Sequence, residues 1–406
     1  MAKLKALSLF SGCGGFCEGV HLAGFDVRTA VEWDKFAAAT YRYNFPETRL
    51  VEGDVRDFLR GSGTKERAEH GLDELDLLFG GPPCQGYSQI GTRKLTDERN
   101  DLYLEFVRVL ARLKPRAFIM ENVPNLLLLN KGHYKHLVLE ALRGAGYSNT
   151  TVLRVVASDY GVPQERNRVF FIGTHDRFEF PHNMEMFASN ALARLRVKRP
   201  VTVWEAIGDL PKSVVPSGCV MPYPEEVFSP FQREMRIDFD GSIYSSAVKK
   251  MRGIQHHEQV ELHNHHTKEI QERRLALIAL LQAGKKADSL PKAIWDGKRP
   301  EKWRRLHPDQ PAYTLLANMH RDLSEFVHPS LQRWITVREA ARLQSFHDGF
   351  VFVGSEWQQL KQIGNAVPPL LALAMGTVAK LAVKALRPRV SKGGRSKQEQ
   401  LKLQIA

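Results

Sequence analysis

The sequence predicts an α/β fold built on a parallel sheet, followed by a second and less regular domain. Over residues 1–175, short apolar runs alternate with segments of helical periodicity, which is typical of parallel strands joined by crossover helices. From about His182 to Arg333 prolines and scattered aromatic residues replace that alternation. With 406 residues, the chain is also longer than one ordinary domain needs.

Each element of the first domain follows from a local pattern. Short apolar runs bounded by glycine, proline or polar residues predict strands, and a further strand is expected before Gly53. The predicted strands are Lys5–Leu9, Phe25–Glu32, Leu75–Phe79, Arg116–Met120 and Arg168–Gly173. Apolar residues at helical spacing predict helices that end near Gly24 or cover Lys35–Tyr43, Leu102–Leu113 and Leu370–Leu386.

Composition and charge narrow the class of protein. Hydrophobic residues make up 43% and charged residues 25%, the balance of a globular protein, and no run reaches the ~20 apolar residues of a membrane span. Four cysteines in a chain of this length do not form a disulfide framework. We therefore expect a cytoplasmic protein without a membrane partner. The net charge of +13 favours a polyanionic partner, most often nucleic acid.

A glycine-rich loop, Phe10–Gly15, follows the first predicted strand and opens a helix. Glycines at this place let a ligand approach the backbone closely, and the helix N-terminus favours a negative group. The dinucleotide pattern G-x-G-x-x-G is incomplete because Cys17 stands at its third glycine, which disfavours a nicotinamide or flavin.

Acidic residues at two strand ends point to a nucleoside ligand. Glu32 ends the second strand and can accept hydrogen bonds from ribose hydroxyls, while Trp33 beside it can stack on a base. Asp54 follows the third strand candidate and can accept from an adenine amino group. S-adenosylmethionine, a nucleoside that carries a carboxylate, fits this set.

The residues that carry out the reaction are expected in the loops that follow the later strands, at the same edge of the sheet. The segment Gly80–Gly86 reads GGPPCQG, and its paired prolines would hold Cys84 as a nucleophile; the alternative is a small buried thiol. Glu121 closes the following strand. Arg166 and Arg168 are two residues apart, so in extended backbone they share a face.

In this order, the motifs resemble those of the DNA (cytosine-5) methyltransferases of bacterial restriction–modification systems. The matching segments are Phe10–Gly15, Glu32-Trp33, Asp54, Pro83-Cys84-Gln85, Glu121-Asn122-Val123, Gln164-x-Arg166-x-Arg168, Arg333 with Thr336, Glu339–Phe346, and Gly364–Pro369. Two features depart from the family pattern. His347 stands where proline is usual after Phe346, and a basic tail follows Leu386.

The resemblance implies a Rossmann-like S-adenosylmethionine-dependent methyltransferase fold with a smaller, irregular target-recognition domain. The implied catalytic domain is 1–185 plus 358–386, and the recognition domain is 186–357, with 333–348 as its organising segment. Residues 387–406 form a basic tail that we expect to be disordered. The implied cofactor-binding residues are Phe10, Ser11, Gly12, Gly14, Gly15, Glu32, Trp33, Asp54, Val55, Pro83, Leu102, Asn365 and Val367.

The resemblance also implies the reaction. Cys84 would add to carbon 6 of a flipped-out cytosine, Glu121 would contact N3, and Arg168 would stabilise O2. Arg166 would hold Glu121 or a backbone phosphate. The implied cofactor is S-adenosylmethionine, with S-adenosylhomocysteine as product and no metal. The implied partner is double-stranded DNA, a cognate restriction endonuclease is a candidate partner, and we expect a monomer.

Three other readings compete with this one. Amino-methylating DNA enzymes carry an aromatic residue after Pro-Pro, where this chain has Cys84. A tRNA cytosine methyltransferase shares Pro-Cys-Gln, but the long 186–335 insert favours duplex DNA. A DNA-binding regulator without catalysis would be expected to lack Cys84 or Glu121.

A histidine cluster in the second domain is interpreted as a polar loop near DNA, with a metal site as the alternative: His256, His257, His263, His265 and His266.

Overall fold

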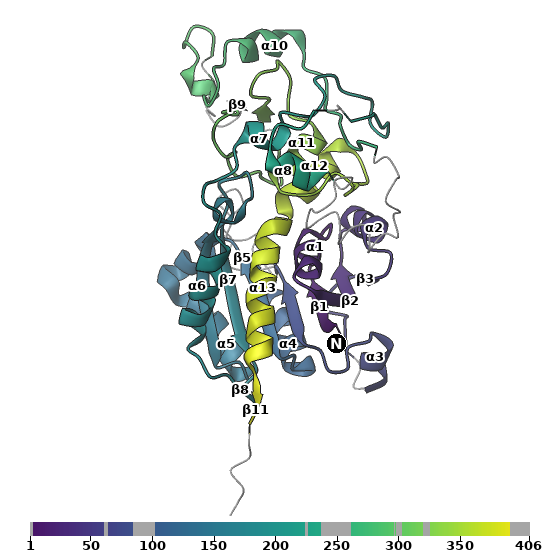
Figure 1. The fold of residues 1–406 in the computed structure, drawn as a ribbon, viewed down its shortest axis with the longest axis vertical. Coiled ribbons are helices and arrows are strands. Elements are labelled where there is room, and N and C mark those ends of the chain that lie inside the picture. Colours follow the sequence, from purple (N-terminus) through teal and green to yellow (C-terminus); the bar gives the residue numbers. More distant parts are fainter. Residues whose placement is uncertain are drawn as a thin grey trace, which may run out of the picture.

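The computed structural model describes residues 3–60, 64–83, 102–223, 226–236, 261–295, 297, 303–319 and 325–389, and the structural statements below refer to these. The α/β architecture is as predicted: a seven-stranded sheet of order β3-β2-β1-β4-β5-β7-β6 lies between two layers of helices (Figure 1). Its strands are β1 (Leu4–Leu9), β2 (Phe25–Glu32), β3 (Arg49–Glu52), β4 (Leu77–Gly80), β5 (Ala117–Asn122), β6 (Asn149–Val156) and β7 (Asn167–Thr174).

The sheet is mixed, which corrects the prediction of a parallel sheet. Strands β1 to β5 pair in parallel, but β7 runs antiparallel to both β5 and β6. Residues 157–166 connect β6 to β7, and a connection this short returns the chain beside the strand that it left, because a parallel neighbour needs a longer crossover. The sequence pattern over Asn149–Val156 did not predict β6.

Helices cover both faces of the sheet. The larger described helices are α1 (Gly15–Leu22), α2 (Lys35–Asn44), α4 (Leu102–Leu113), α5 (His133–Gly144), α6 (Met184–Leu195), α12 (Glu356–Asn365) and α13 (Pro369–Ala385). The side chains of α1, α6 and α13 pack into one core on one face of the sheet, and those of α4 and α5 pack into a second core on the other.

Two glycines allow α1 and α13 to touch. A Cβ on Gly19 would lie 2.3 Å from the Pro369 carbonyl oxygen, and one on Gly376 would lie 2.9 Å from the Ala23 Cβ. The stretch Glu356–Ala385 is long and apolar enough by composition to cross a membrane, but 67% of its apolar window is buried inside the protein. Within this fold, α13 is a core helix.

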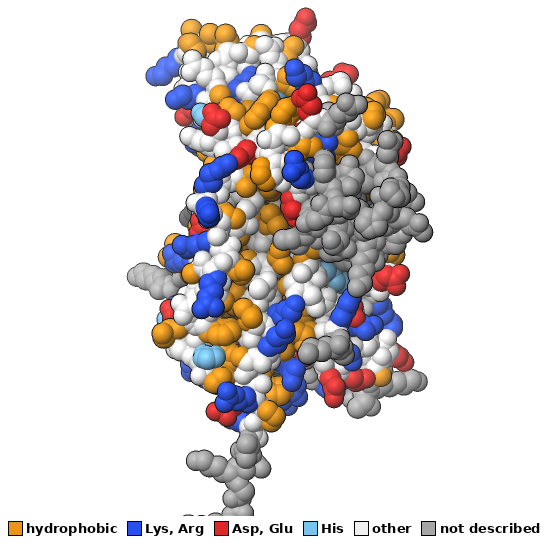
Figure 2. Space-filling model, in the orientation of Figure 1, with side chains coloured by type: hydrophobic (Ala, Val, Ile, Leu, Met, Phe, Trp, Pro, Cys, Tyr) orange, Lys and Arg blue, Asp and Glu red, His pale blue; other side chains and the backbone are white. Residues whose placement is uncertain are grey.

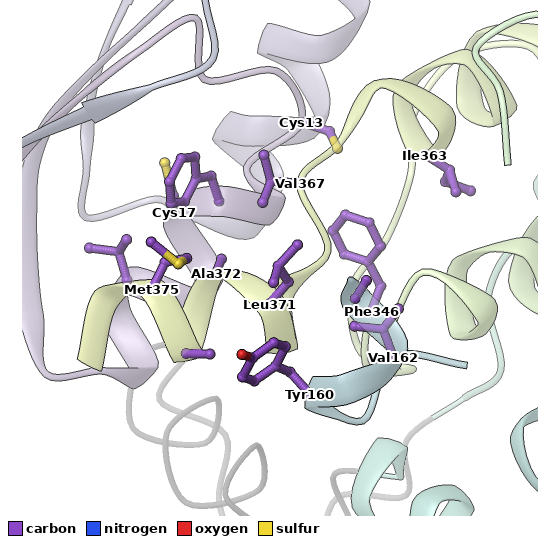
Figure 3. Close-up of a cluster of buried hydrophobic side chains, with 14 of the residues drawn as sticks. Cys13, Cys17, Tyr160, Val162, Phe346, Ile363, Val367, Leu371, Ala372 and Met375 are labelled. Carbon is purple, nitrogen blue, oxygen red and sulfur yellow. The ribbon is translucent and has the colours of Figure 1, made fainter. Parts of the chain in front are cut away.

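A second lobe sits above the sheet unit and shares its core. It contains α12 together with α7 (Val203–Ile207), α8 (Pro230–Met235), α10 (Glu272–Ala279), α11 (Val337–Leu343) and the paired strands β9 (Trp303–Arg305) and β10 (Glu325–Val327). Figure 3 shows the junction, where Phe346 lies beside Leu371, and Ile363 and Val367 belong to the same core. A separate small cluster around Trp303 and Trp334 stabilises the far end of the lobe.

Two predicted domain boundaries, 185/186 and 357/358, fall inside helices, the second of them inside α12. Position 185 falls within α6, which packs on β6 and α13, so the packing favours a boundary after this helix. The predicted disordered tail begins too early, because β11 (Arg387–Pro388) pairs with β8 (Phe178–Glu179). Residues 390–406 lie outside the described residues.

Figure 2 shows Lys and Arg side chains distributed over both lobes, in keeping with the net charge of +13.

Buried polar groups fix the start of α11. Thr336 and Glu339 form a capping box, and Arg333 makes a bidentate ion pair with Glu339 at 2.9 and 2.7 Å. His328 Nε2 lies 3.6 Å from a Glu339 oxygen. Burial lowers the pKa of His328 to about 4, so this histidine is neutral at pH 7 and the contact is not an ion pair there.

This arrangement predicts loss of stability in acid. The ordinary histidine pKa is 6.5, so between pH 6.5 and about 4 His328 binds a proton in the unfolded chain but not in the folded one. The free energy of unfolding therefore falls as the pH is lowered through this range. Burial acts to raise the pKa of Glu339, but the charge of Arg333 outweighs it, and the pKa falls to about 2. The free energy of unfolding therefore falls a second time as the pH drops below 4.5. Thermal denaturation between pH 7.5 and 4 should show the first loss, and His328→Gln should reduce it; an equal loss in that variant would contradict the assignment to His328.

Candidate active site

A cavity of about 1290 Å³ opens at the carboxyl ends of the parallel strands. The loops after β1, β2, β3, β4 and β5 all contribute to its wall, as expected for ligand sites of open α/β sheets. The wall contains every predicted cofactor residue except Gly14: Phe10, Ser11, Gly12, Gly15, Glu32, Trp33, Asp54, Val55, Pro83, Leu102, Asn365 and Val367.

The glycine loop forms one end of this cavity. Gly12 has a φ of 56° with open space beside it, and its N–H donates to Glu32 Oε2 at 2.7 Å. Gly14, with a φ of 106°, has no room for a side chain, because a Cβ there would collide with the Phe45 ring. The Ser11 side chain points into the protein, and its hydroxyl donates to Ser8 Oγ at 2.8 Å.

The carboxyl group of Glu32 can accept hydrogen bonds from a polar ligand in the cavity. Its second oxygen accepts from the Asp34 N–H at 2.7 Å, so two backbone donors hold the carboxylate in place. Burial raises the pKa of Glu32, and these backbone hydrogen bonds lower it only in part. Trp33 lies at the rim with 67% of its surface exposed, and Asp54 accepts from the Arg56 N–H at 2.9 Å.

The predicted nucleophile, Cys84, lies outside the described residues, whereas the residues directly before it lie at the cavity. The Asn122 side-chain amide donates to the Pro82 carbonyl at 3.1 Å, which ties this loop to the end of β5. A Cβ on Gly81 would lie 2.9 Å from Glu121 Oε2. The chain that leads into Cys84 therefore passes directly beside the Glu121 carboxyl group.

Glu121 and Arg168 form a buried pair in the cavity wall. Arg168 Nε lies 2.8 Å from Glu121 Oε1, and each side chain is only 13% exposed. Burial raises the pKa of Glu121, while the charges of Arg168 and Arg166 lower it less strongly, so the net shift is upward. A carboxyl group with a raised pKa beside a cation can hold a proton and donate it to a ligand.

Arg166 is bound to the backbone of two segments that are distant in sequence. Its guanidinium donates to the carbonyl oxygens of Leu315, Gly364 and Ala366 at 2.9, 2.8 and 3.0 Å, and it makes no direct contact with Glu121. Arg166 and Arg168 both line the cavity, although β7 begins only at Asn167 and Arg166 lies in the preceding connection. Arg166 binds the segment around Asn365 to the sheet unit.

Sequence reasoning missed part of the cavity wall. Residues 315–318 belong to the lining, and Leu315 contacts Arg166, yet they lie in the irregular region that offers no periodicity. Lys361 and Gln362 were missed as well, because each is a common polar residue on a helix.

Among the histidines of the second domain, His265 has two polar contacts within the fold. His265 lies 2.8 Å from the Pro211 carbonyl and 3.2 Å from Thr336 Oγ1. Within the described ranges, no group of three or more His, Cys, Asp or Glu could hold a metal ion; His256 and His257 lie outside them. The unusual His347 is buried, with its Nε2 3.4 Å from Glu18 Oε1 of α1.

Comparison with known proteins gives one consistent answer. Residues 4–380 match the family described as C-5 cytosine-specific DNA methylase. The chain is 34% identical to the Type II methyltransferase M.AgeI of Thalassovita gelatinovora, covering 94% of this chain and 100% of that protein. It is 33% identical to the Type II methyltransferase M.XorII of Xanthomonas oryzae pv. oryzae, covering 97% and 87%.

Solved structures agree with the sequence comparison. A structure assigned as a DNA modification methyltransferase encoded within a prophage (E. coli) superposes with a TM-score of 0.72 at 28% identity, covering 94% of this chain and 99% of that one. The S. pombe Dnmt2 methyltransferase gives a TM-score of 0.53 at 14% identity, over 94% and 99% of the two chains, which shows a shared fold only. The predicted Rossmann-like methyltransferase fold is confirmed.

Proposed function

Because the chain belongs to the C-5 cytosine-specific DNA methylases and is thus a DNA (cytosine-5) methyltransferase, we propose that it modifies one cytosine within a specific short duplex DNA sequence. The observation that carries the assignment of residues is the buried Glu121–Arg168 pair, which lies in the same cavity as the glycine loop and beside the residues that precede Cys84. Its carboxyl group and guanidinium match the N3 and O2 edge of a cytosine.

The cofactor of this family is S-adenosylmethionine, and the cavity has the donor set that this molecule needs. Glu32 offers a carboxylate to ribose hydroxyls, and Asp54 offers one to an adenine amino group. Val55, Pro83 and Leu102 line the cavity with apolar surface for a purine ring. The open space beside Gly12 leaves room for the rest of the molecule. When bound, the cofactor supplies the electrophilic methyl group.

In this mechanism the protein makes carbon 5 of cytosine nucleophilic. The Cys84 thiolate adds to carbon 6, so a C–S bond forms and electron density moves to carbon 5. A proton on Glu121 contacts N3, and Arg168 faces O2, where negative charge develops. After methyl transfer, carbon 5 gives its proton to water, the C–S bond breaks, and the Cys84 thiolate is regenerated.

A stacked cytosine cannot be reached in this way, so the base must first leave the duplex, at a cost of a few kcal/mol. The space between the two lobes would receive it. The excess of Lys and Arg would bind the phosphates, which makes DNA affinity strongly dependent on salt. Base edges would be read by the lobe formed from the 186–335 region.

Replacement of Glu121 by glutamine should lower kcat by about a hundredfold to a thousandfold, which lies within the usual range of general acid–base contributions. Glutamine keeps the size of the side chain, but it cannot share a proton with N3. In the wild-type enzyme, the methylation rate should fall as pH rises through the raised pKa of Glu121. Single-turnover kinetics across pH measure both effects, and a glutamine variant with the wild-type rate would remove Glu121 from the mechanism.

Bisulfite sequencing of DNA from a methylation-free bacterial host that expresses the protein tests the function itself. Protected cytosines confined to one short motif are expected, and the motif is the target sequence. Absence of protected cytosines with soluble, folded protein would favour an RNA substrate or a DNA-binding role without catalysis.

Further expectations concern the cellular setting. We expect a cytoplasmic monomer, since one chain holds both a reaction site and a second lobe. The relatives M.AgeI and M.XorII are named as Type II methyltransferases, which supports a role in protecting DNA against a cognate restriction endonuclease.

A further inference from the structure

An ion pair joins two residues in the wall of the cavity. Lys361 Nζ lies 2.7 Å from Asp34 Oδ2, although the two residues are 327 positions apart. Both residues line the cavity: Asp34 caps α2, and Lys361 lies in α12. The pair therefore joins the loop after β2 to the segment that continues into Asn365.

Asp34 is fixed by several bonds that leave one oxygen for Lys361. Its Oδ1 accepts from the Phe36 and Ala37 N–H groups at 3.0 and 3.2 Å, and its own N–H donates to Glu32 at 2.7 Å. Burial acts to raise the pKa of Asp34, but the hydrogen bond from Lys361 and those from the backbone leave it below its ordinary value. Asp34 is therefore a carboxylate at neutral pH and a strong acceptor.

The ion pair lies close in sequence to residues on two sides of the cavity, Asn365 and Trp33. Lys361 and Asn365 are four residues apart and share one face of α12. On the other side, Trp33 stands directly before Asp34, and its largely exposed ring has little packing to hold it. The position of Trp33 thus depends on the bonds made by its neighbours, including the bond from Asp34 to α12.

We propose that the Asp34–Lys361 ion pair is a latch that holds Trp33 and Asn365 in place around the bound cofactor, with Lys361 as a positioning residue. The proposal rests on the proposed function, since it takes the cavity to be the S-adenosylmethionine site. The two side chains are 35% and 34% exposed, and pairs of this kind add little to folding stability. Loss of the latch should therefore change ligand binding and leave the fold intact.

Isothermal titration of the full chain with S-adenosylhomocysteine, without DNA, tests the latch. Lys361→Met and Asp34→Asn should each raise Kd about threefold to tenfold, and the double variant should be no worse than either. Asparagine retains the oxygen that caps α2, so Asp34→Asn removes the charge and not the cap. Lys361→Arg should restore most of the affinity, and Lys384→Met, on an exposed lysine of α13, serves as the matched control.

Salt and kinetics distinguish a latch from a purely structural role. Raising NaCl from about 50 to 500 mM should weaken wild-type binding of S-adenosylhomocysteine more than binding by Lys361→Met, because salt screens the pair. In that variant KM for S-adenosylmethionine should rise while kcat stays unchanged. If the wild type binds S-adenosylhomocysteine and both variants keep its Kd, the latch is wrong and the proposed function stands. A wild-type chain that binds none overturns both.

Discussion

Replacement of Cys84 by serine is expected to lower the rate of methyl transfer by on the order of 10³-fold or more, while DNA binding remains largely intact. Only a thiolate is nucleophilic enough at neutral pH to add to carbon 6, and a serine hydroxyl in the same loop stays protonated. Serine is similar in size to cysteine, so the loop and its neighbours should keep their positions.

Two measurements separate the chemical step from binding. Transfer of a radioactive methyl group to duplex DNA gives the rate, and a gel-shift titration at fixed salt gives the DNA affinity. Cys219→Ser is the matched control, because that cysteine is exposed and remote in sequence from the site motifs, and it should show the wild-type rate. Full activity in Cys84→Ser would exclude the covalent mechanism.

Local signals in the sequence were enough for the elements that bear the site. The predicted range of β2 agrees with its observed bounds, Phe25–Glu32, and that of α4 agrees with Leu102–Leu113. Both segments have strong apolar patterns that suit their place in the sheet or on its face. β6 was missed because it begins Asn149-Thr150-Thr151, and polar residues on an edge strand give a weak pattern.

Other features depend on contacts distant in sequence. Nothing in an apolar run tells the direction of a strand, so the antiparallel β7 could not be predicted from residues 167–174 alone. The carbonyl partners of Arg166 lie about 150 and 200 positions away, at Leu315, Gly364 and Ala366. The resemblance located Arg166 at the site, but only the fold shows what its guanidinium binds. Lys361 gave no signal for the same reason.

Replacement of Arg342 by methionine is expected to lower the free energy of unfolding by about 3–5 kcal/mol, the usual result of breaking a buried ion pair. The guanidinium of Arg342 is fully buried and pairs with the carboxylates of Asp209 and Asp348. It also donates to the Ala206 carbonyl of α7 at 3.0 Å. Methionine fills similar space but leaves both carboxylates short of a cation, although Arg236 still pairs with Asp209 at 2.8 Å.

An exposed ion pair provides the matched comparison. Arg199 also pairs with a carboxylate, that of Glu205, but its side chain is 68% exposed, so Arg199→Met should cost less than about 1 kcal/mol. Urea denaturation of both variants measures the difference, and equal losses would contradict the ion network around Arg342. Because Arg342 joins α7 to α11, its loss should loosen the second lobe before the sheet unit. Hydrogen exchange should then rise first in α7 and α11, while the core strands β1 and β4 stay protected.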